Sequence, residues 1–153
     1  MSKTPYDYAL NLLTARAYTS GGLRRKLTQK GFEKSQVDET IDRLTENGLL
    51  NDAKYAEEFA RQRLVVSGAS RRRVEQLLAS KGISRDVAQS ASQKVVEEEE
   101  VDTIAAIEKI ARKKLLSLGD LEPMIKRRRV FGLLARKGYE LEDINQVLSR
   151  ILP

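Results

Sequence analysis

The sequence contains 153 residues, and its 41% of apolar side chains is enough to bury a core in one domain or in a few small repeats. The 28 lysines and arginines exceed the 22 aspartates and glutamates, and this net charge of +6 is typical of proteins that bind nucleic acid or an acidic protein surface. Histidine and cysteine are absent, which excludes Ser-His-Asp and Cys-His catalytic sites, Cys/His zinc sites, iron–sulfur clusters and disulfides.

A Lys-Gly pair preceded by a basic and apolar segment occurs three times along the chain. The segments are Leu23–Gly31, Val74–Gly82 and Val130–Gly138. In each, apolar residues stand eight and four positions before the glycine, and another apolar residue follows it. This spacing predicts a helix that ends at a left-handed glycine cap, with the next apolar residue folded back onto the last turn.

Each of these segments is expected to be the middle helix of a three-helix unit. Leading helices are predicted over residues 7–17, 52–66 and 102–116, and a last helix is predicted to begin near Ser35, Ser84 and Glu142. Ser35 and Asp38 form a weak capping box. No stretch alternates with a period of two, so we expect no sheet.

The chain is therefore predicted to be all-α, with three tandem three-helix, helix-turn-helix-like repeats that form an elongated stack, curved or straight. The predicted repeat boundaries are 1–50, 51–100 and 101–153. The stretch from Ser84 to Leu118 contains neither glycine nor proline, so it forms either one long helix or two adjoining helices with Asp102 as the cap between them. The acidic run 97–100 is interpreted as a solvated helix face, because four adjacent side chains point in different directions.

The basic excess is concentrated in the middle helices, where it recurs at the same phase of the repeat and is expected to face solvent. Such a display indicates a binding surface, although inherited or solubilising charges give the same pattern. Most aromatic residues are interpreted as core, so contacts to nucleic acid would be chiefly to phosphates. The candidate binding residues are Arg24, Arg25, Lys26, Arg71, Arg72, Arg73, Lys126, Arg127, Arg128, Arg129 and Arg136.

Carboxylate, lysine Schiff-base and magnesium chemistry remain open by composition, but no acidic residue lies in a recognisable catalytic motif. We therefore expect no enzymatic activity and no cofactor. The N-terminal residues 1–8 lack the apolar core of a signal peptide, and no stretch approaches the length of a membrane span. These features predict a cytoplasmic protein that does not enter a membrane.

The order and spacing of short motifs across the chain resemble the RecX family of bacterial recombination regulators. The resemblance covers about residues 7–152, and the chain departs from the family pattern at Gly22 and Leu77, where glutamate is usual, and at Gly132, where arginine is common. The motifs that carry it are Arg16–Tyr18, Leu23–Leu27, Lys30–Gly31, Gly48–Asp52, Tyr55–Phe59, Gly68, Arg73–Val74, Lys81–Ile83, Arg136–Tyr139 and Glu142–Ile144.

The resemblance implies a non-enzymatic regulator that binds the RecA recombinase in the helical groove of its filament on single-stranded DNA. Such a protein would inhibit filament growth, strand exchange and the coupled ATP hydrolysis. We expect it to be a monomer, with at most weak direct binding to DNA. The alternative is a direct DNA-binding protein of the helix-turn-helix type, with one basic helix in the major groove.

Overall fold

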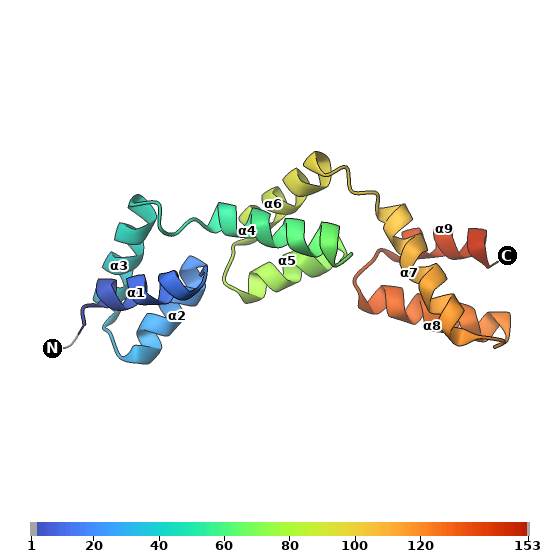
Figure 1. The fold of residues 1–153 in the computed structure, drawn as a ribbon, viewed down its shortest axis with the longest axis horizontal. Helices are drawn as coiled ribbons and strands as arrows, with labels where there is room; N and C mark the ends of the chain where they lie inside the picture. Colours follow the sequence, from blue (N-terminus) through green and yellow to red (C-terminus); the bar gives the residue numbers. More distant parts are fainter. Residues whose placement is uncertain (1–2, 153) are drawn as a thin grey trace. The chain divides into compact units, whose positions relative to one another are not determined.

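The computed structural model describes residues 3–152 (Figure 1). Over that range all regular secondary structure is helical and there is no strand, as the sequence predicted. The helices are α1 (Pro5–Ala15), α2 (Ser20–Lys30), α3 (Lys34–Glu46), α4 (Asp52–Arg61), the π-helical turn η1 (Gln62–Val66), α5 (Arg71–Ser80), α6 (Arg85–Glu98), α7 (Thr103–Leu118), α8 (Pro123–Arg136) and α9 (Leu141–Ile151).

The contacts group the chain into two compact units. Unit 1 contains the residues up to Phe59 together with Glu75–Lys94, and unit 2 contains Ala60–Val74 together with the residues from Val95 onward. Each unit therefore combines one terminal set of three helices with part of the middle set α4–α6. The residue boundaries 1–50, 51–100 and 101–153 stay predictions.

In unit 1 the helices α1, α2 and α3 pack around one apolar cluster. Its fully buried centre includes Leu23 and Leu27 of α2, the two positions that the glycine spacing marked as core. The other buried members are Ala9, Val37, Ile41, Leu44 and Leu50. Burying each of the larger apolar side chains stabilises the folded state by about 1.5–3 kcal/mol. Because the apolar residues of α2 occupy its inner face, its basic residues lie on the outer face.

Unit 2 repeats this arrangement with α7, α8 and α9. Val130 and Leu134 of α8 are fully buried at the positions that correspond to Leu23 and Leu27. The cluster also contains Ile107, Ala111, Tyr139, Ile144, Val147 and Leu148. In the middle set, the equivalent Val74 and Leu78 of α5 are likewise 0% exposed, so the predicted core phase of all three middle helices is confirmed.

The three Lys-Gly corners adopt the predicted left-handed cap. Gly31, Gly82 and Gly138 have φ values of 105°, 86° and 93°, respectively. The amide of the residue after each glycine donates back to a carbonyl of the last helical turn, as in the bond of 3.2 Å from Tyr139 N to Leu134 O. Because side chains with a Cβ are strained at these φ values, glycine allows each middle helix to stop where it does.

Each unit contains the same junction between the start of one middle helix and the corner that ends another. In unit 1 the Thr19 hydroxyl accepts a hydrogen bond from Gly22 N at 2.9 Å and donates to Lys81 O at 2.5 Å. In unit 2 the Ser70 hydroxyl accepts from Arg73 N at 3.1 Å and donates to Lys137 O at 2.7 Å. One hydroxyl thus caps a helix and also satisfies a carbonyl that the left-handed turn leaves open.

The junction in unit 1 also requires two glycines in contact. A Cβ placed on Gly21 would lie 3.0 Å from the Cα of Gly82, tighter than nine in ten Cβ contacts in proteins, and the atom it meets is backbone. The Ser20 amide donates to the Asp52 carboxylate at 2.8 Å, which ties the start of α2 to the start of α4. These contacts fix the position of the basic helix α2.

One local prediction differs from the structure, and another is confirmed. The capping box of α3 pairs Glu33 with Gln36 rather than Ser35 with Asp38, so the helix begins at Lys34. Asp38 lies one turn further on and pairs with Arg24 instead. The prediction for Asp102 is confirmed: α6 ends at Glu98, and the Asp102 carboxylate accepts from Ala105 N at 3.0 Å at the start of α7.

Gly31→Val should lower the free energy of unfolding by about 1–2 kcal/mol, because valine is strained at positive φ. A Cβ at Gly31 would meet no atom within 4 Å, so the loss comes from the backbone alone. Gly31→Asn, which tolerates the left-handed region, should lose less. Urea unfolding followed by circular dichroism measures both, and equal stability of the two variants would contradict this account.

Thr19→Val should lower the free energy of unfolding by about 1–3 kcal/mol, because it removes both the helix cap and the bond to Lys81 O. The matched control is Thr28→Val on the exposed face of the same helix, which should stay within about 0.5 kcal/mol of the original protein. A loss at position 19 no larger than at position 28 would show that the junction does not contribute.

Candidate binding surface of the middle helices

The predicted binding residues all lie in the three middle helices. Arg24, Arg25 and Lys26 follow the first turn of α2, and 71–73 form the first three residues of α5. The segment 126–129 occupies the first half of α8, whose last residue is Arg136. As predicted, each of these helices buries its apolar face in the cores described above.

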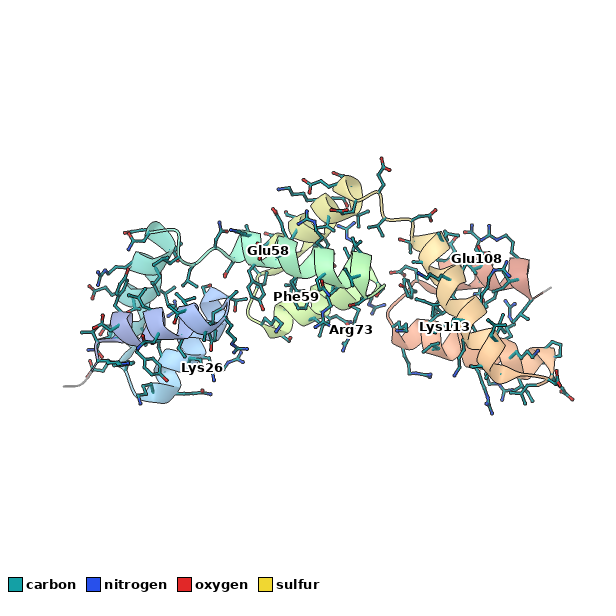
Figure 2. All side chains as sticks on the ribbon, viewed as in Figure 1. Lys26, Glu58, Phe59, Arg73, Glu108 and Lys113 are labelled. Atoms are coloured by element: carbon teal, nitrogen blue, oxygen red, sulfur yellow. The ribbon has the colours of Figure 1, made fainter. Side chains whose placement is uncertain are left out.

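Most of these side chains are exposed. In Figure 2 the side chain of Arg73 extends away from α5, and Lys26 marks the basic segment of α2. The exposed members are Arg25, Lys26, Arg72, Arg73, Arg128, Arg129 and Arg136, and the half-buried ones are Arg24, Arg71, Lys126 and Arg127. Across residues 3–152, none of the seven exposed side chains forms an ion pair. Their charge is therefore available to an anionic partner.

Two of the half-buried arginines are held by neighbouring helices. Arg24 forms an ion pair with Asp38 of α3, and Arg127 donates to the Asn145 side chain of α9 at 3.4 Å. Because the Arg24 and Asp38 side chains are 43% and 44% exposed, this pair contributes little to stability. Arg24 is therefore less available for binding than Arg25 and Lys26.

The basic segments do not share one phase of the repeat, which corrects the sequence interpretation. In α5 and α8 the arginines precede the buried Val74 and Val130, whereas in α2 they follow the buried Leu23. Counted from the corner glycine, Arg24 stands seven residues back and Arg71 eleven. A difference of four residues is about one helical turn, or about 6 Å along the axis, so the charges lie on a similar side of each helix but at a different height.

The start of α5 is held by a second contact besides Ser70. The buried Tyr139 donates its phenol hydrogen to the carbonyl of Gly68, just before the helix. Burial raises the pKa of this phenol above its ordinary value, because the charged form would lose its hydration. The neutral donor therefore persists at physiological pH, and the arginines 71–73 begin from a fixed backbone.

The acidic run does not form a candidate site. Residues 97–100 are exposed, and Arg61 pairs with Glu98 at 3.0 Å and with Glu99 at 2.9 Å. No cluster of acidic residues in the described part of the chain is arranged to hold a metal ion. No described helix is long and apolar enough to cross a membrane.

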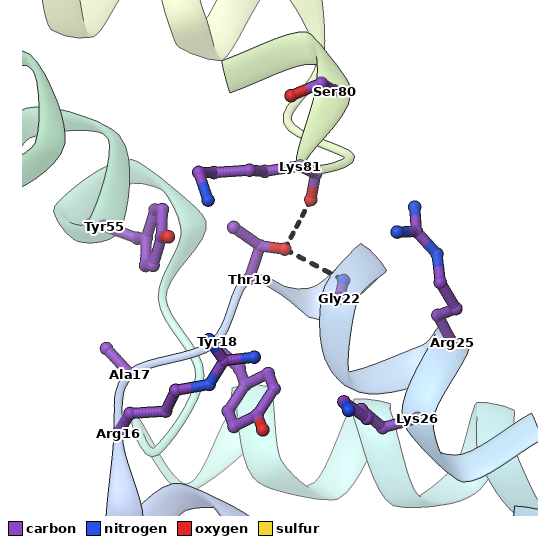
Figure 3. Close-up of a pocket in the computed structure, with 10 residues that line it drawn as sticks. All are labelled: Arg16, Ala17, Tyr18, Thr19, Gly22, Arg25, Lys26, Tyr55, Ser80 and Lys81. Atoms are coloured by element: carbon purple, nitrogen blue, oxygen red, sulfur yellow. Dashed lines mark hydrogen bonds between the residues drawn. The ribbon is translucent and has the colours of Figure 1, made fainter. Parts of the chain in front are cut away.

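Unit 1 contains a basic pocket that the sequence analysis did not identify (Figure 3). It has a volume of about 270 Å³, and the residues around it come from the turn before α2, from α2, from α4 and from the corner after α5. The basic and aromatic side chains that line it are Arg16, Tyr18, Arg25, Lys26, Tyr55 and Lys81. The Thr19 junction lies at its wall, where Figure 3 shows both hydrogen bonds of the hydroxyl.

The sequence analysis singled out Arg25 and Lys26 but not Arg16 or Lys81. Arg16 and Lys81 are 65 residues apart in the sequence, and their segments meet at the junction between Thr19 and Lys81 and at the neighbouring contact of Gly21 with Gly82. Both did fall inside motifs, Arg16–Tyr18 and Lys81–Ile83, that carried the family resemblance. Their place in these motifs was the one signal in the sequence, and it gave no information on the distance between Arg16 and Lys81 in the fold.

Comparison with known proteins finds the same family along the whole length of the matched regions. Models of the first, second and third three-helix domains of RecX match residues 6–44, 51–91 and 100–148, respectively. The regulatory protein RecX of Amycolatopsis mediterranei (strain U-32) is 35% identical over 137 residues, which cover 90% of this chain and 77% of that protein. The regulatory protein RecX of Pseudomonas entomophila (strain L48) is 32% identical over 142 residues, covering 92% and 87%.

The fold also matches solved structures. The crystal structure of RecX from Lactobacillus salivarius superimposes with a TM-score of 0.83 over 95% of this chain and 93% of that one, at 22% sequence identity. A second crystal structure of a regulatory protein RecX gives a TM-score of 0.82 over 95% of this chain and 70% of that one, at 19% sequence identity. At identities of 22% and 19% the likeness shows the fold, and it confirms the three tandem three-helix domains.

Proposed function

This chain belongs to the RecX family of regulatory proteins, and we propose that it regulates the RecA recombinase without being an enzyme. In this proposal it binds the RecA filament on single-stranded DNA in the cytoplasm and inhibits filament growth, strand exchange and ATP hydrolysis. The observation that carries the proposal is the match of all three family domains, in order, over most of the chain.

The charge distribution supports an anionic partner. The seven exposed cations of the middle helices form no ion pair within the described residues. The opposite faces of these helices form the core, so the cations themselves take no part in it. Arginine on a helix suits both phosphate and carboxylate, through its planar donor fork. A nucleoprotein filament offers both groups, as DNA phosphates and as acidic side chains of the recombinase.

The second candidate is direct, sequence-dependent recognition of duplex DNA by one basic helix. The three-helix repeats and the basic start of α5 favour it, since a recognition helix reads bases from its N-terminal residues. Reading bases would make duplex affinity depend on sequence, with about 1–3 kcal/mol lost for each mismatched pair. Contacts to phosphates alone would be tolerant of sequence and weaken as salt rises.

Replacement of Arg71, Arg72 and Arg73 by glutamate should raise the amount of protein needed for half-inhibition of RecA by about tenfold, because three attractive contacts become repulsive. The measurement is single-stranded-DNA-dependent ATP hydrolysis and strand exchange by RecA at increasing amounts of protein. Circular dichroism should show unchanged helix content, since residues 71–73 lie outside the core.

The matched control replaces Lys109, Lys113 and Lys114 of α7 by glutamate, which changes the net charge equally outside the middle helices. It should inhibit as the original protein does. Equal loss in both variants would mean that only net charge matters, and no inhibition by the original protein at saturating amounts would reject the proposed function.

A further inference from the structure

The basic pocket of unit 1 concentrates positive charge without a counterion. Four cations line it, namely Arg16, Arg25, Lys26 and Lys81, and no aspartate or glutamate does. Within residues 3–152 none of the four forms an ion pair with a carboxylate. Like charges around one small volume repel each other, so an anion in the pocket would remove that repulsion and gain attraction from each cation.

The pocket also presents aromatic rings. The Arg16 guanidinium lies 4.4 Å from the centroid of the Tyr18 ring, and Tyr55 lines the pocket from α4. Neither phenol hydroxyl takes part in a hydrogen bond with another described residue, so both remain available to a ligand. Figure 3 shows the two tyrosines on either side of the chain segment that leads to Thr19.

A second hollow of about 330 Å³ adjoins the basic pocket and shares Ala17, Tyr18 and Tyr55 with it. Its other walls carry one lysine, Lys54, one glutamate, Glu58, and the apolar Leu13 and Leu49. Leu49 is 50% exposed, which is large for an apolar side chain. The same two tyrosines therefore border a strongly basic hollow and a nearly neutral, partly apolar one.

We propose that these adjoining hollows bind one nucleotide unit, with its phosphate among the four cations and its base or sugar against the tyrosines and the leucines. Each hollow is close to the lower end of ligand-pocket volumes, which suits one nucleotide rather than a large ligand. Arginine and lysine are the usual phosphate partners, and tyrosine rings stack on any base. The ligand chemistry is a phosphorylated nucleoside, supplied either by single-stranded DNA or by a free nucleotide.

An acidic peptide fits the observations less well. Carboxylates would satisfy the four cations, but they would leave the aromatic and leucine walls of the adjoining hollow unused. A nucleotide uses both the cations and the aromatic and leucine walls, because one sugar joins its charged phosphate to its planar base. The inference rests on the proposed function only for the choice of single-stranded DNA as a probe.

The test replaces Arg16 and Lys81 by glutamine, since both lie outside the basic segments assigned to the RecA filament. Their side chains take no part in the Thr19 junction, where Lys81 contributes only its backbone carbonyl. The control replaces Lys109 and Lys113 of α7 by glutamine, which removes the same charge from unit 2. Circular dichroism and the thermal midpoint verify that both variants are folded.

Binding of a fluorescent oligothymidylate to the protein alone is measured by anisotropy at several salt concentrations. The pocket variant should bind about tenfold more weakly and should lower the slope of log affinity against log salt by about 0.7, the value for one lost phosphate contact on a single strand. The control should keep the original slope. Equal affinities and slopes for the pocket variant and the control would overturn the proposal.

Competition separates the two sources. Displacement of the oligonucleotide by thymidine monophosphate, but not by the same concentration of inorganic phosphate, assigns the pocket to a free nucleotide, and resistance to displacement assigns it to the DNA strand. Binding of polyglutamate that depends on Arg16 and Lys81, without such dependence for the oligonucleotide, would overturn nucleotide binding. Because RecA is absent, failure here leaves the proposed function standing, and failure of RecA inhibition leaves the pocket standing.

Discussion

The hydrogen bond from a helix-capping hydroxyl to the carbonyl of a Lys-Gly corner is the interaction on which the rest of this structure depends. A left-handed glycine ends each middle helix and leaves a carbonyl without an intrahelical partner. Thr19 in unit 1 and Ser70 in unit 2 donate to such a carbonyl while they cap the start of another middle helix. The glycine therefore ends one helix, and the hydroxyl both begins another helix and joins the two.

This junction explains how function can be built from surfaces rather than from reactive groups. It fixes the starts of α2 and α5, and the basic residues lie close to those starts, 71–73 in the first turn of α5 and 24–26 in the second turn of α2. In unit 1 it also brings Arg16 and Lys81, which are distant in sequence, to one pocket. A chain without histidine or cysteine can thus present placed charges to an anionic partner, which suits a regulator that acts by occupying a binding surface.

The sequence predicted the core positions and the corners because both follow from local rules. Apolar residues four and eight positions before a glycine must lie on one helix face, and lysine followed by glycine marks the stop, so Leu23, Leu27 and Gly31 could be placed correctly. The pocket could not be predicted, since it depends on a contact between residues 19 and 81. The pairing of Arg24 with Asp38 depends likewise on the angle between α2 and α3, which periodicity does not determine.

The central claim is that the exposed cations of the middle helices face the RecA filament. A photo-crosslinking amino acid at position 72 of α5 or 129 of α8, in the presence of RecA on single-stranded DNA, tests this most directly. The account predicts crosslinks to RecA or DNA from both positions and none from the exposed positions 39 of α3 and 146 of α9. Crosslinks from positions 39 and 146, with none from 72 and 129, would contradict it.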